Sequence, residues 1–114
     1  MESESITLGY ARSEAEVILH RGFVHWWDGH RMRRILCWAQ DDQCAICGGE
    51  MSRFNVTIEH VWPRGAGGFN GPGNMVGAHR GCNHAKADRL PTGCEVISLV
   101  AVCMRLDVPV RLRA

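Results

Sequence analysis

The chain has 114 residues, of which 46% are hydrophobic and 22% are charged, and its formal net charge is +1. This length suits one domain rather than two, and no apolar run is long enough to cross a membrane. The first residues are polar and acidic, unlike a secretion signal. We therefore expect a cytoplasmic protein without a membrane partner, in which the six cysteines are metal ligands or core residues rather than disulfides.

Charge is distributed unevenly along the chain. Residues 1–59 carry six arginines and nine acidic residues, a net charge of −3. Residues 60–114 carry six arginines, one lysine and three acidic residues, a net charge of +4. A basic half fits a surface that faces phosphates. An arginine-rich composition can also reflect a GC-rich genome, so charge alone does not establish a nucleic-acid partner.

Residues 1–12 are predicted to form a flexible tail, and residues 13–43 a helical N-terminal part. Ser13 and Glu16 have the spacing of a capping box, which begins a helix. Asp28 can cap a second helix, in which apolar residues recur at helical spacing. The residues of this predicted buried face are Met32, Ile35, Leu36 and Ala39.

The central part of the chain predicts two strands and a helix. Residues 57–61 favour a short strand, because they include β-branched side chains. Residues 63–73 form a glycine-rich loop that is neither helix nor regular strand. Residues 74–76 can return as a second strand, and residues 79–88 predict a helix. The order strand, loop, strand and helix is a ββα unit.

The last predicted element is a helix over residues 94–106. Pro91 ends the preceding helix, and Thr92 with Glu95 repeats the spacing of a capping box. Its predicted buried face consists mostly of Cys94, Ile97, Leu99, Val100 and Cys103.

Two pairs of metal-binding residues enclose the two predicted strands. Cys44 and Cys47 form a C-x-x-C turn, and His79 and Cys82 have the same spacing. Thiolates and imidazole bind zinc in tetrahedral geometry, and four protein ligands leave no open position for a substrate. The four residues therefore predict a structural Zn²⁺ site, whose occupancy we expect to be coupled to folding in so small a domain.

Other readings of the cysteines and histidines are open at this point. Cys82 can be a core residue and His79 a surface residue at the start of a helix. Cys94 can replace His79 as the fourth zinc ligand. Otherwise Cys37, Cys94 and Cys103 lack a partner at ligand spacing and are expected to be core cysteines.

Glu59 and His60 are adjacent on the first predicted strand, so their side chains point to opposite faces. Alone, this dipeptide indicates no function. With its surroundings it resembles the HNH nucleases, a branch of the ββα-metal (His-Me finger) endonucleases. The resemblance covers about two-fifths of the chain and rests on an ordered set of residues. The set is Cys44-x-x-Cys47, Ile58-Glu59-His60-Val61-x-Pro63, Gly67-Gly68, Asn74-Met75-Val76 and His79-x-x-Cys82-Asn83-x-x-Lys86-x-Asp88-Arg89.

The resemblance implies a role for each of four site residues. His60 would be the general base, which takes a proton from the attacking water and has a suitable pKa near neutral pH. Glu59 and Asn83 would hold a catalytic Mg²⁺ or Mn²⁺ through oxygen atoms. Asn74 would brace the loop and keep His60 oriented.

Three residues depart from the usual family pattern. Glu59 stands where the family more often has Asp, which can shift the ion or favour Mn²⁺. His79 replaces the more usual cysteine and should weaken zinc affinity. His84 follows Asn83 and can compete as a ligand or contact phosphate.

The implied fold is α+β, with a small ββα-metal (HNH) core and structural zinc knuckle over residues 44–89. Helices flank this core on the N-terminal side and over residues 90–114 on the C-terminal side, in a single domain over residues 1–114.

The implied function is a metal-dependent hydrolase that cleaves DNA and leaves 3′-hydroxyl and 5′-phosphate ends. Double-stranded DNA is the expected partner, although the sequence leaves RNA open, and the protein can be a monomer or a homodimer. Nicking with low sequence specificity is expected, because the chain has no separate reading module. Arg64, Lys86 and Arg89 are candidate phosphate contacts, or simply solvated surface charges. The alternative function is a non-catalytic zinc-knuckle module that binds DNA or protein.

Overall fold

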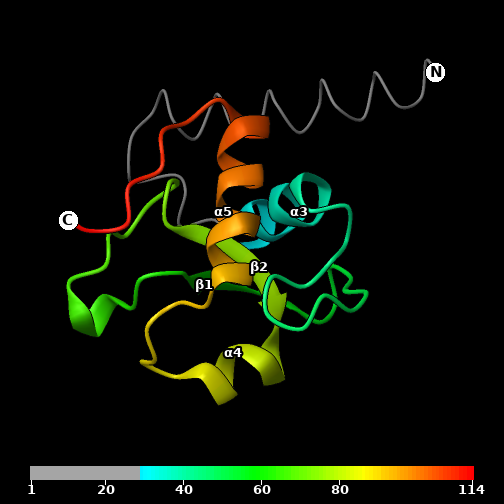
Figure 1. The fold of residues 1–114 in the computed structure, drawn as a ribbon. Helices are drawn as coiled ribbons and strands as arrows, with labels where there is room; N and C mark the ends of the chain where they lie inside the picture. The colour runs from blue at the N-terminus through cyan, green and yellow to red at the C-terminus, as the bar shows by residue number, and fades with distance from the viewer. Residues whose placement is uncertain (1–28) are drawn as a thin grey trace.

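A two-stranded antiparallel sheet lies at the centre of the structure, a computed structural model in which residues 29–114 are described (Figure 1). Strand β1 (Val56–His60) pairs with β2 (Met75–His79), so that Ile58 lies opposite Gly77 and His60 opposite Met75. The predicted tail, the helix at Ser13 and the cap at Asp28 lie outside the described residues.

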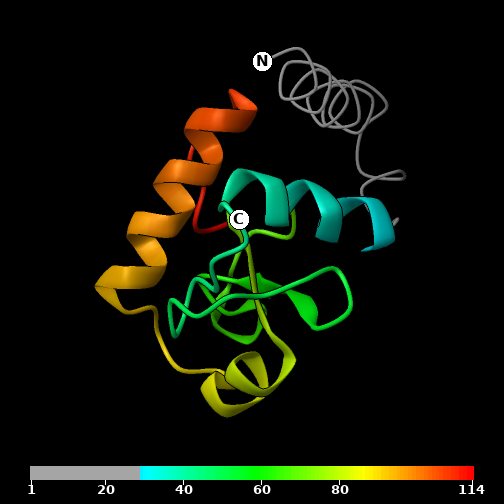
Figure 2. The same cartoon turned by 90° about the vertical axis from the view of Figure 1, so that its right-hand side faces the viewer.

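Three α-helices within residues 29–114 enclose this hairpin. Helix α3 (Gly29–Ala39) and helix α5 (Gly93–Leu106) lie on one side of the hairpin, and the short helix α4 (Arg80–Lys86) lies on the other (Figure 2). Helix α4 follows β2 directly, so β1, β2 and α4 form a ββα unit. The predicted α+β fold class is confirmed. No helix within residues 29–114 is long and apolar enough to span a membrane.

The main core lies between α3, α5 and the sheet. All four residues that the helical spacing assigned to the inner face of α3 are buried, together with Cys37. Because these side chains alternate at three and four positions, they form one stripe that packs on the sheet. The other buried members of this core are Ala45, Val61, Met75, Val76, Leu99, Val102, Cys103 and Leu106.

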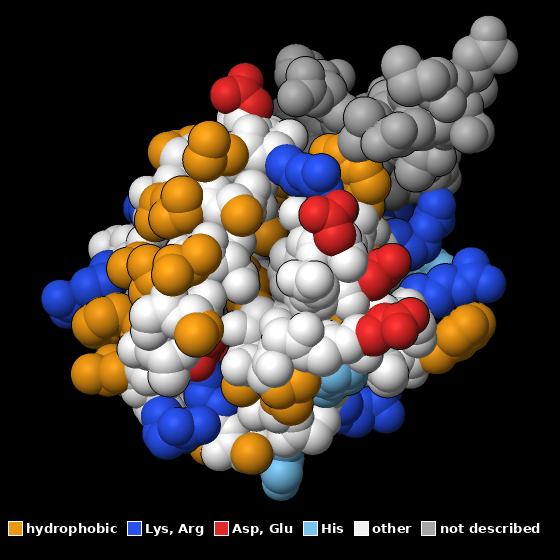
Figure 3. Space-filling model, turned by 45° about the vertical axis from the view of Figure 1, so that its right-hand side comes forward, with side chains coloured by type: hydrophobic (Ala, Val, Ile, Leu, Met, Phe, Trp, Pro, Cys, Tyr) orange, Lys and Arg blue, Asp and Glu red, His pale blue; other side chains and the backbone are white. Residues whose placement is uncertain are grey.

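Helix α5 begins as predicted but buries a different face. Its capping box is present, with hydrogen bonds in both directions between Thr92 and Glu95. Leu99 is buried, whereas Ile97 is 71% exposed. Hydrophobic side chains gather over α5 on the left of Figure 3, where they face outward. The prediction was therefore wrong for three residues, since the exposed set also includes Cys94 and Val100. The buried face is Glu95, Leu99, Val102, Cys103 and Leu106.

The glycine-rich loop between the strands contains a 3-10 turn (Arg64–Ala66) and is otherwise irregular. Gly68 is required there, because a Cβ atom would lie 1.9 Å from the carbonyl oxygen of Trp62. The C-terminal segment runs along the loop: Phe69 donates a backbone hydrogen bond to Leu112, and Ala114 donates one to the loop. The end of the chain therefore fixes the loop that follows β1.

Candidate metal and catalytic site

The four predicted zinc ligands come together in space. The ligand atoms of Cys44, Cys47, His79 and Cys82 all lie within 4.8 Å of one another. The turn before β1 carries the first two, His79 ends β2, and Cys82 lies in the first turn of α4. The hairpin therefore brings together two pairs that are far apart in the sequence. Cys94, the alternative fourth ligand, is not a member of this group.

The imidazole of His79 is oriented for metal binding through Nδ1. Its Nε2 lies 2.7 Å from the carbonyl oxygen of Glu50, which can only accept a hydrogen bond. This contact places the proton on Nε2 and leaves the Nδ1 lone pair free. Nδ1 lies 3.3 Å from Sγ of Cys47 and 3.8 Å from Sγ of Cys82.

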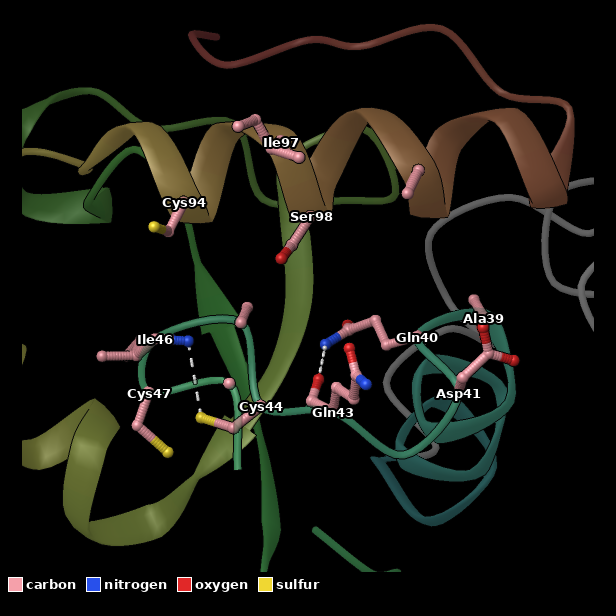
Figure 4. Close-up of a pocket in the computed structure, with 13 residues that line it drawn as sticks. Ala39, Gln40, Asp41, Gln43, Cys44, Ile46, Cys47, Cys94, Ile97 and Ser98 are labelled. Carbon is pink, nitrogen blue, oxygen red and sulfur yellow. Dashed lines mark hydrogen bonds between the residues drawn. The ribbon is translucent and has the colours of Figure 1, made fainter. Parts of the chain in front are cut away.

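Backbone amides of the knuckle donate to the sulfur atoms. Sγ of Cys44 accepts from the amides of Ile46 at 3.4 Å, drawn in Figure 4, and of His79 at 3.3 Å. Gly49 donates to Cys47 at 3.3 Å, and Gly48 adopts the positive φ of 76° that the turn requires.

Burial opposes ionisation of the Cys44 thiol, but these hydrogen bonds outweigh it and lower its pKa to about 7. Burial and its cysteine neighbours instead raise the pKa of Cys82 to about 11. A cation is therefore needed to hold Cys82 as a thiolate, and the donor set of the four residues fits Zn²⁺.

Glu59, a predicted ligand of the catalytic ion, is only 4% exposed. Its Oε1 lies 3.5 Å from Nζ of Lys86, and its Oε2 is buried without a hydrogen-bond partner. The pKa of this carboxyl is raised to about 7, mainly by burial. Lys86 opposes the rise, and Glu95 adds to it. A buried carboxylate oxygen without a partner is costly, and a bound divalent cation would satisfy it.

Asn83, the other predicted ligand, joins α4 to β1. Its Nδ2 donates to Oγ1 of Thr57 at 3.1 Å and to the carbonyl oxygen of Ile58 at 3.2 Å. Thr57 and Glu59 are two positions apart on a strand and so lie on one face. Asn83 therefore belongs to the same side of the hairpin as Glu59. Both contacts are made by Nδ2, and Oδ1 of Asn83 accepts no hydrogen bond within the described residues. Oδ1 of Asn83 and Oε2 of Glu59 are oxygen ligands of the kind that suits Mg²⁺ or Mn²⁺.

His60 is held by a residue of the glycine-rich loop. Its Nε2 lies 2.9 Å from Oδ1 of Asn70, which accepts the Nε2 proton and leaves Nδ1 as the basic nitrogen. Burial lowers the pKa of His60, Arg64 and Lys86 lower it further, and the Asn70 contact partly opposes them. The imidazole is therefore neutral at neutral pH, the form that a general base requires.

Asn74 is fully buried and ties the two ends of the loop together. Its Oδ1 accepts from the amide of Trp62 at 2.8 Å, while Nδ2 donates to the carbonyl oxygens of Trp62 at 2.9 Å and Phe69 at 2.8 Å. Phe69 precedes Asn70, so these hydrogen bonds fix the segment that contacts His60.

Lys86 differs from its predicted role as a phosphate contact. Its side chain is fully buried, and Nζ donates to the carbonyl oxygens of Val61 at 2.8 Å and His60 at 3.2 Å. Lysine can be buried only where its charge is paired, and Glu59 and Glu95 supply that pairing. The other two candidate phosphate contacts, Arg64 and Arg89, are exposed, as is His84.

Sequence reasoning missed two residues of the site. Asn70 lies in a loop rich in glycine, where no spacing connects it to His60. Glu95 was identified only as a helix cap, although its carboxylate also reaches Lys86. Glu95 is only 1% exposed, and this burial indicates its second role. The burial is visible in the structure but not in the sequence.

A pocket of about 370 Å³ lies beside the knuckle rather than at His60 (Figure 4). Residues of α5 line one wall and the turn around Cys44 lines the other. Glu59, His60 and Asn83 are not among the lining residues, so this pocket is separate from the catalytic candidates.

Comparison with known proteins supports the fold. No protein-family model and no curated protein matches the chain. The structure is similar to the crystal structure of the Type II-C Cas9 enzyme from Actinomyces naeslundii, with a TM-score of 0.51 at 15% sequence identity. The match covers 95% of this chain and 16% of that chain. At this identity the likeness concerns the fold alone, and the match spans only a small part of that enzyme's length.

Proposed function

We propose that this chain is a metal-dependent HNH endonuclease that hydrolyses phosphodiester bonds of DNA, with His60 as the general base. The observation that carries the proposal is the pairing of two features at the end of β1. Glu59 offers a buried carboxylate oxygen without a partner, and the neighbouring His60 is held by Asn70 in the tautomer whose Nδ1 can accept a proton. The likeness to a Cas9 enzyme also supports a nucleic-acid substrate.

In this mechanism the neutral His60 accepts a proton from water through Nδ1 as the water oxygen attacks the phosphorus. Asn70 holds Nε2–H, so the imidazole does not turn away from its substrate. The bond from phosphorus to the 3′ oxygen breaks, and the leaving 3′ oxygen takes a proton from solvent water, which leaves 3′-hydroxyl and 5′-phosphate ends. One chain has one such set of residues among those described, so we propose that it nicks one strand, with low sequence specificity.

Glu59 and Asn83 would hold the catalytic Mg²⁺ or Mn²⁺ through Oε2 and Oδ1. When bound, such an ion neutralises the negative charge that develops on the phosphate and on the leaving oxygen. A Zn²⁺ held by the knuckle would be structural, since its four ligands would tie the turn before β1 to the start of α4.

One observation favours the alternative, a zinc-knuckle module that binds nucleic acid or protein without catalysis. Oε1 of Glu59 already pairs with Lys86, and the carboxylate is 4% exposed. If the carboxylate cannot accept an ion, the same scaffold would bind without cleaving.

Cleavage of supercoiled plasmid by zinc-loaded protein separates the two functions. With Mg²⁺ or Mn²⁺ the wild type should produce nicked circles, and with EDTA it should not. His60→Ala should lower the rate about a hundredfold, as expected for loss of a general base. His30→Ala, a change at an exposed histidine of α3, is the matched control.

Two other outcomes would contradict the proposal. Folded, zinc-loaded wild type that leaves DNA and single-stranded RNA intact in both metals would support the binding module. Full activity of His60→Ala would mean that His60 is not the base, and His84→Ala would then be tested.

A further inference from the structure

Glu95 lies outside the ββα unit, yet its carboxylate reaches the catalytic candidates. Its Oε1 is fixed by the capping box of α5, where it lies 3.3 Å from Oγ1 of Thr92. Its Oε2 makes no hydrogen bond but lies 2.6 Å from Nζ of Lys86, with which it forms an ion pair. Because the two oxygens have separate partners, the start of α5 determines where the charge on Oε2 is placed.

Lys86 is the junction between Glu95 and β1. Besides Glu95, Nζ contacts Oε1 of Glu59 at 3.5 Å and the backbone oxygens of His60 and Val61. One ammonium group therefore touches the carboxylate of the predicted metal ligand and the peptide of the predicted base. The three side chains of this cluster, Lys86, Glu59 and Glu95, are each at least 95% buried, while the exposed Arg89 acts on Glu59 through its charge from outside the cluster.

The charges of this cluster do not cancel. With both carboxylates ionised, these three buried side chains carry a net charge of −1. Buried charge of this kind is unfavourable unless it is compensated. The nearer carboxylate oxygen of Glu59 is directed to Lys86, while its second oxygen is unpartnered. A divalent cation on that second oxygen would supply the missing positive charge.

We propose that Glu95 is a positioning residue for the catalytic metal site and acts through Lys86. Glu95 holds the Lys86 ammonium at a distance from Glu59, so that Glu59 keeps Oε2 for the ion instead of forming a closed ion pair. This inference rests on the proposed function, because it concerns the same ion. It assigns part of the metal site to α5, which contributes no ligand.

The direct test is Mn²⁺ binding to zinc-loaded protein without DNA, measured by electron paramagnetic resonance, for the wild type and Glu95→Gln. Glutamine preserves the capping box, so α5 should still form. Its amide nitrogen would replace Oε2 beside Lys86, and two donors would then face each other. Lys86 should move toward Glu59 and compete with the ion, weakening Mn²⁺ affinity about ten- to a hundredfold, the usual effect of losing an outer partner. Asp107→Asn removes one exposed charge from the end of the same helix and should change affinity less than twofold.

A second pair of variants tests whether Glu95 acts through Lys86. In the Lys86→Met background, Glu95→Gln should change Mn²⁺ affinity less than twofold, because the group that it releases is gone. Equal losses in both backgrounds would show a direct effect of Glu95 and overturn the proposed route. If Lys86→Met does not fold, as zinc content and melting would reveal, Glu95→Gln alone decides the role of Glu95.

Failure of this inference differs from failure of the proposed function. If the wild type binds Mn²⁺ at a site removed by Glu59→Gln, and Glu95→Gln binds it equally well, Glu95 is only structural. If the wild type neither binds Mn²⁺ nor nicks DNA, the metal site itself is wrong and both proposals are overturned. Mn²⁺ affinity that falls in Glu95→Gln, with an unchanged melting temperature, supports the inference.

Discussion

The imidazole Nε2 of His60 lies 2.9 Å from Oδ1 of Asn70. The two residues come from different parts of the hairpin: His60 ends β1, whereas Asn70 lies in the loop that leads to β2. A side-chain oxygen can hold the histidine in one tautomer only while the loop keeps its shape. The orientation of the base therefore depends on the loop, and the loop depends on Asn74 and the C-terminal segment.

Asn70→Ala should allow both tautomers of His60 and loosen the ring. A single hydrogen bond contributes about 1 kcal/mol, so the nicking rate should fall about five- to tenfold. Nitrogen chemical shifts of the His60 ring, measured by NMR, should change from the Nε2–H pattern to a mixture. Asn55→Ala, in a loop before β1, is the matched control, and an unchanged ring spectrum in Asn70→Ala would refute the assigned contact.

Asn74→Ala should destabilise the protein more than Asn70→Ala does. The change removes three part-buried hydrogen bonds, those of the Asn74 side chain with the amide and carbonyl of Trp62 and with the carbonyl of Phe69. Each lost hydrogen bond costs about 1 kcal/mol, so we expect a loss of about 3 kcal/mol in the free energy of unfolding. Urea unfolding of zinc-loaded protein measures it. A loss no larger than that of Asn70→Ala would mean that Asn74 does not brace the loop.

The parts of the structure that follow from local pattern were predictable. The inner face of α3 shows as apolar residues at helical spacing, and the zinc ligands as two pairs with C-x-x-C or H-x-x-C spacing. Both signals depend on residues that are near each other in the chain. The second strand was predicted too short: it extends to His79, because pairing with β1 outweighs the weak strand preference of Gly77.

The remaining features depend on contacts that sequence spacing does not encode. Helix α5 is apolar on two faces, and only packing against α3 and the sheet selects the face with Leu99. Lys86 has the spacing of a surface residue on α4, and its burial depends on Glu95 of another helix. Asn70 lies in a loop whose path is set by the C-terminal segment. Each is a tertiary effect that overrides a local one.

Two variants of α5 test which of its faces is buried. Leu99→Ala empties a fully buried position and should cost about 2–5 kcal/mol in the free energy of unfolding. Ile97→Ala, at a position that is 71% exposed, should change it by less than about 0.5 kcal/mol. Comparable losses in the two variants would mean that the apolar face with Ile97 is buried in a contact with another molecule in solution.

Thiol counting tests the metal centre without any assay of activity. In zinc-loaded protein, Cys94 is the one exposed thiol outside the metal group. Cys37 and Cys103 should react slowly, because burial raises the pKa of each thiol to about 11. We expect one fast thiol per chain, and none in Cys94→Ser. Removal of zinc should expose all six cysteines, because folding is coupled to the metal. More than one fast thiol in loaded protein would show that the four-ligand centre is not formed.

Salt dependence of DNA binding tests the candidate phosphate contacts. Arg64 and Arg89 are exposed, in the loop after β1 and just beyond α4, and their charges act on His60 and Glu59 respectively. Each arginine that neutralises a phosphate releases counterions, so Arg64→Ala and Arg89→Ala should each reduce the slope of log affinity against log salt by about 1. Arg53→Ala removes the same charge from an exposed position in the loop before β1, and it should leave the slope unchanged. An equal reduction in all three variants would indicate general attraction by net charge rather than contacts at the site. An unchanged slope in all three would remove both residues from the proposed DNA surface.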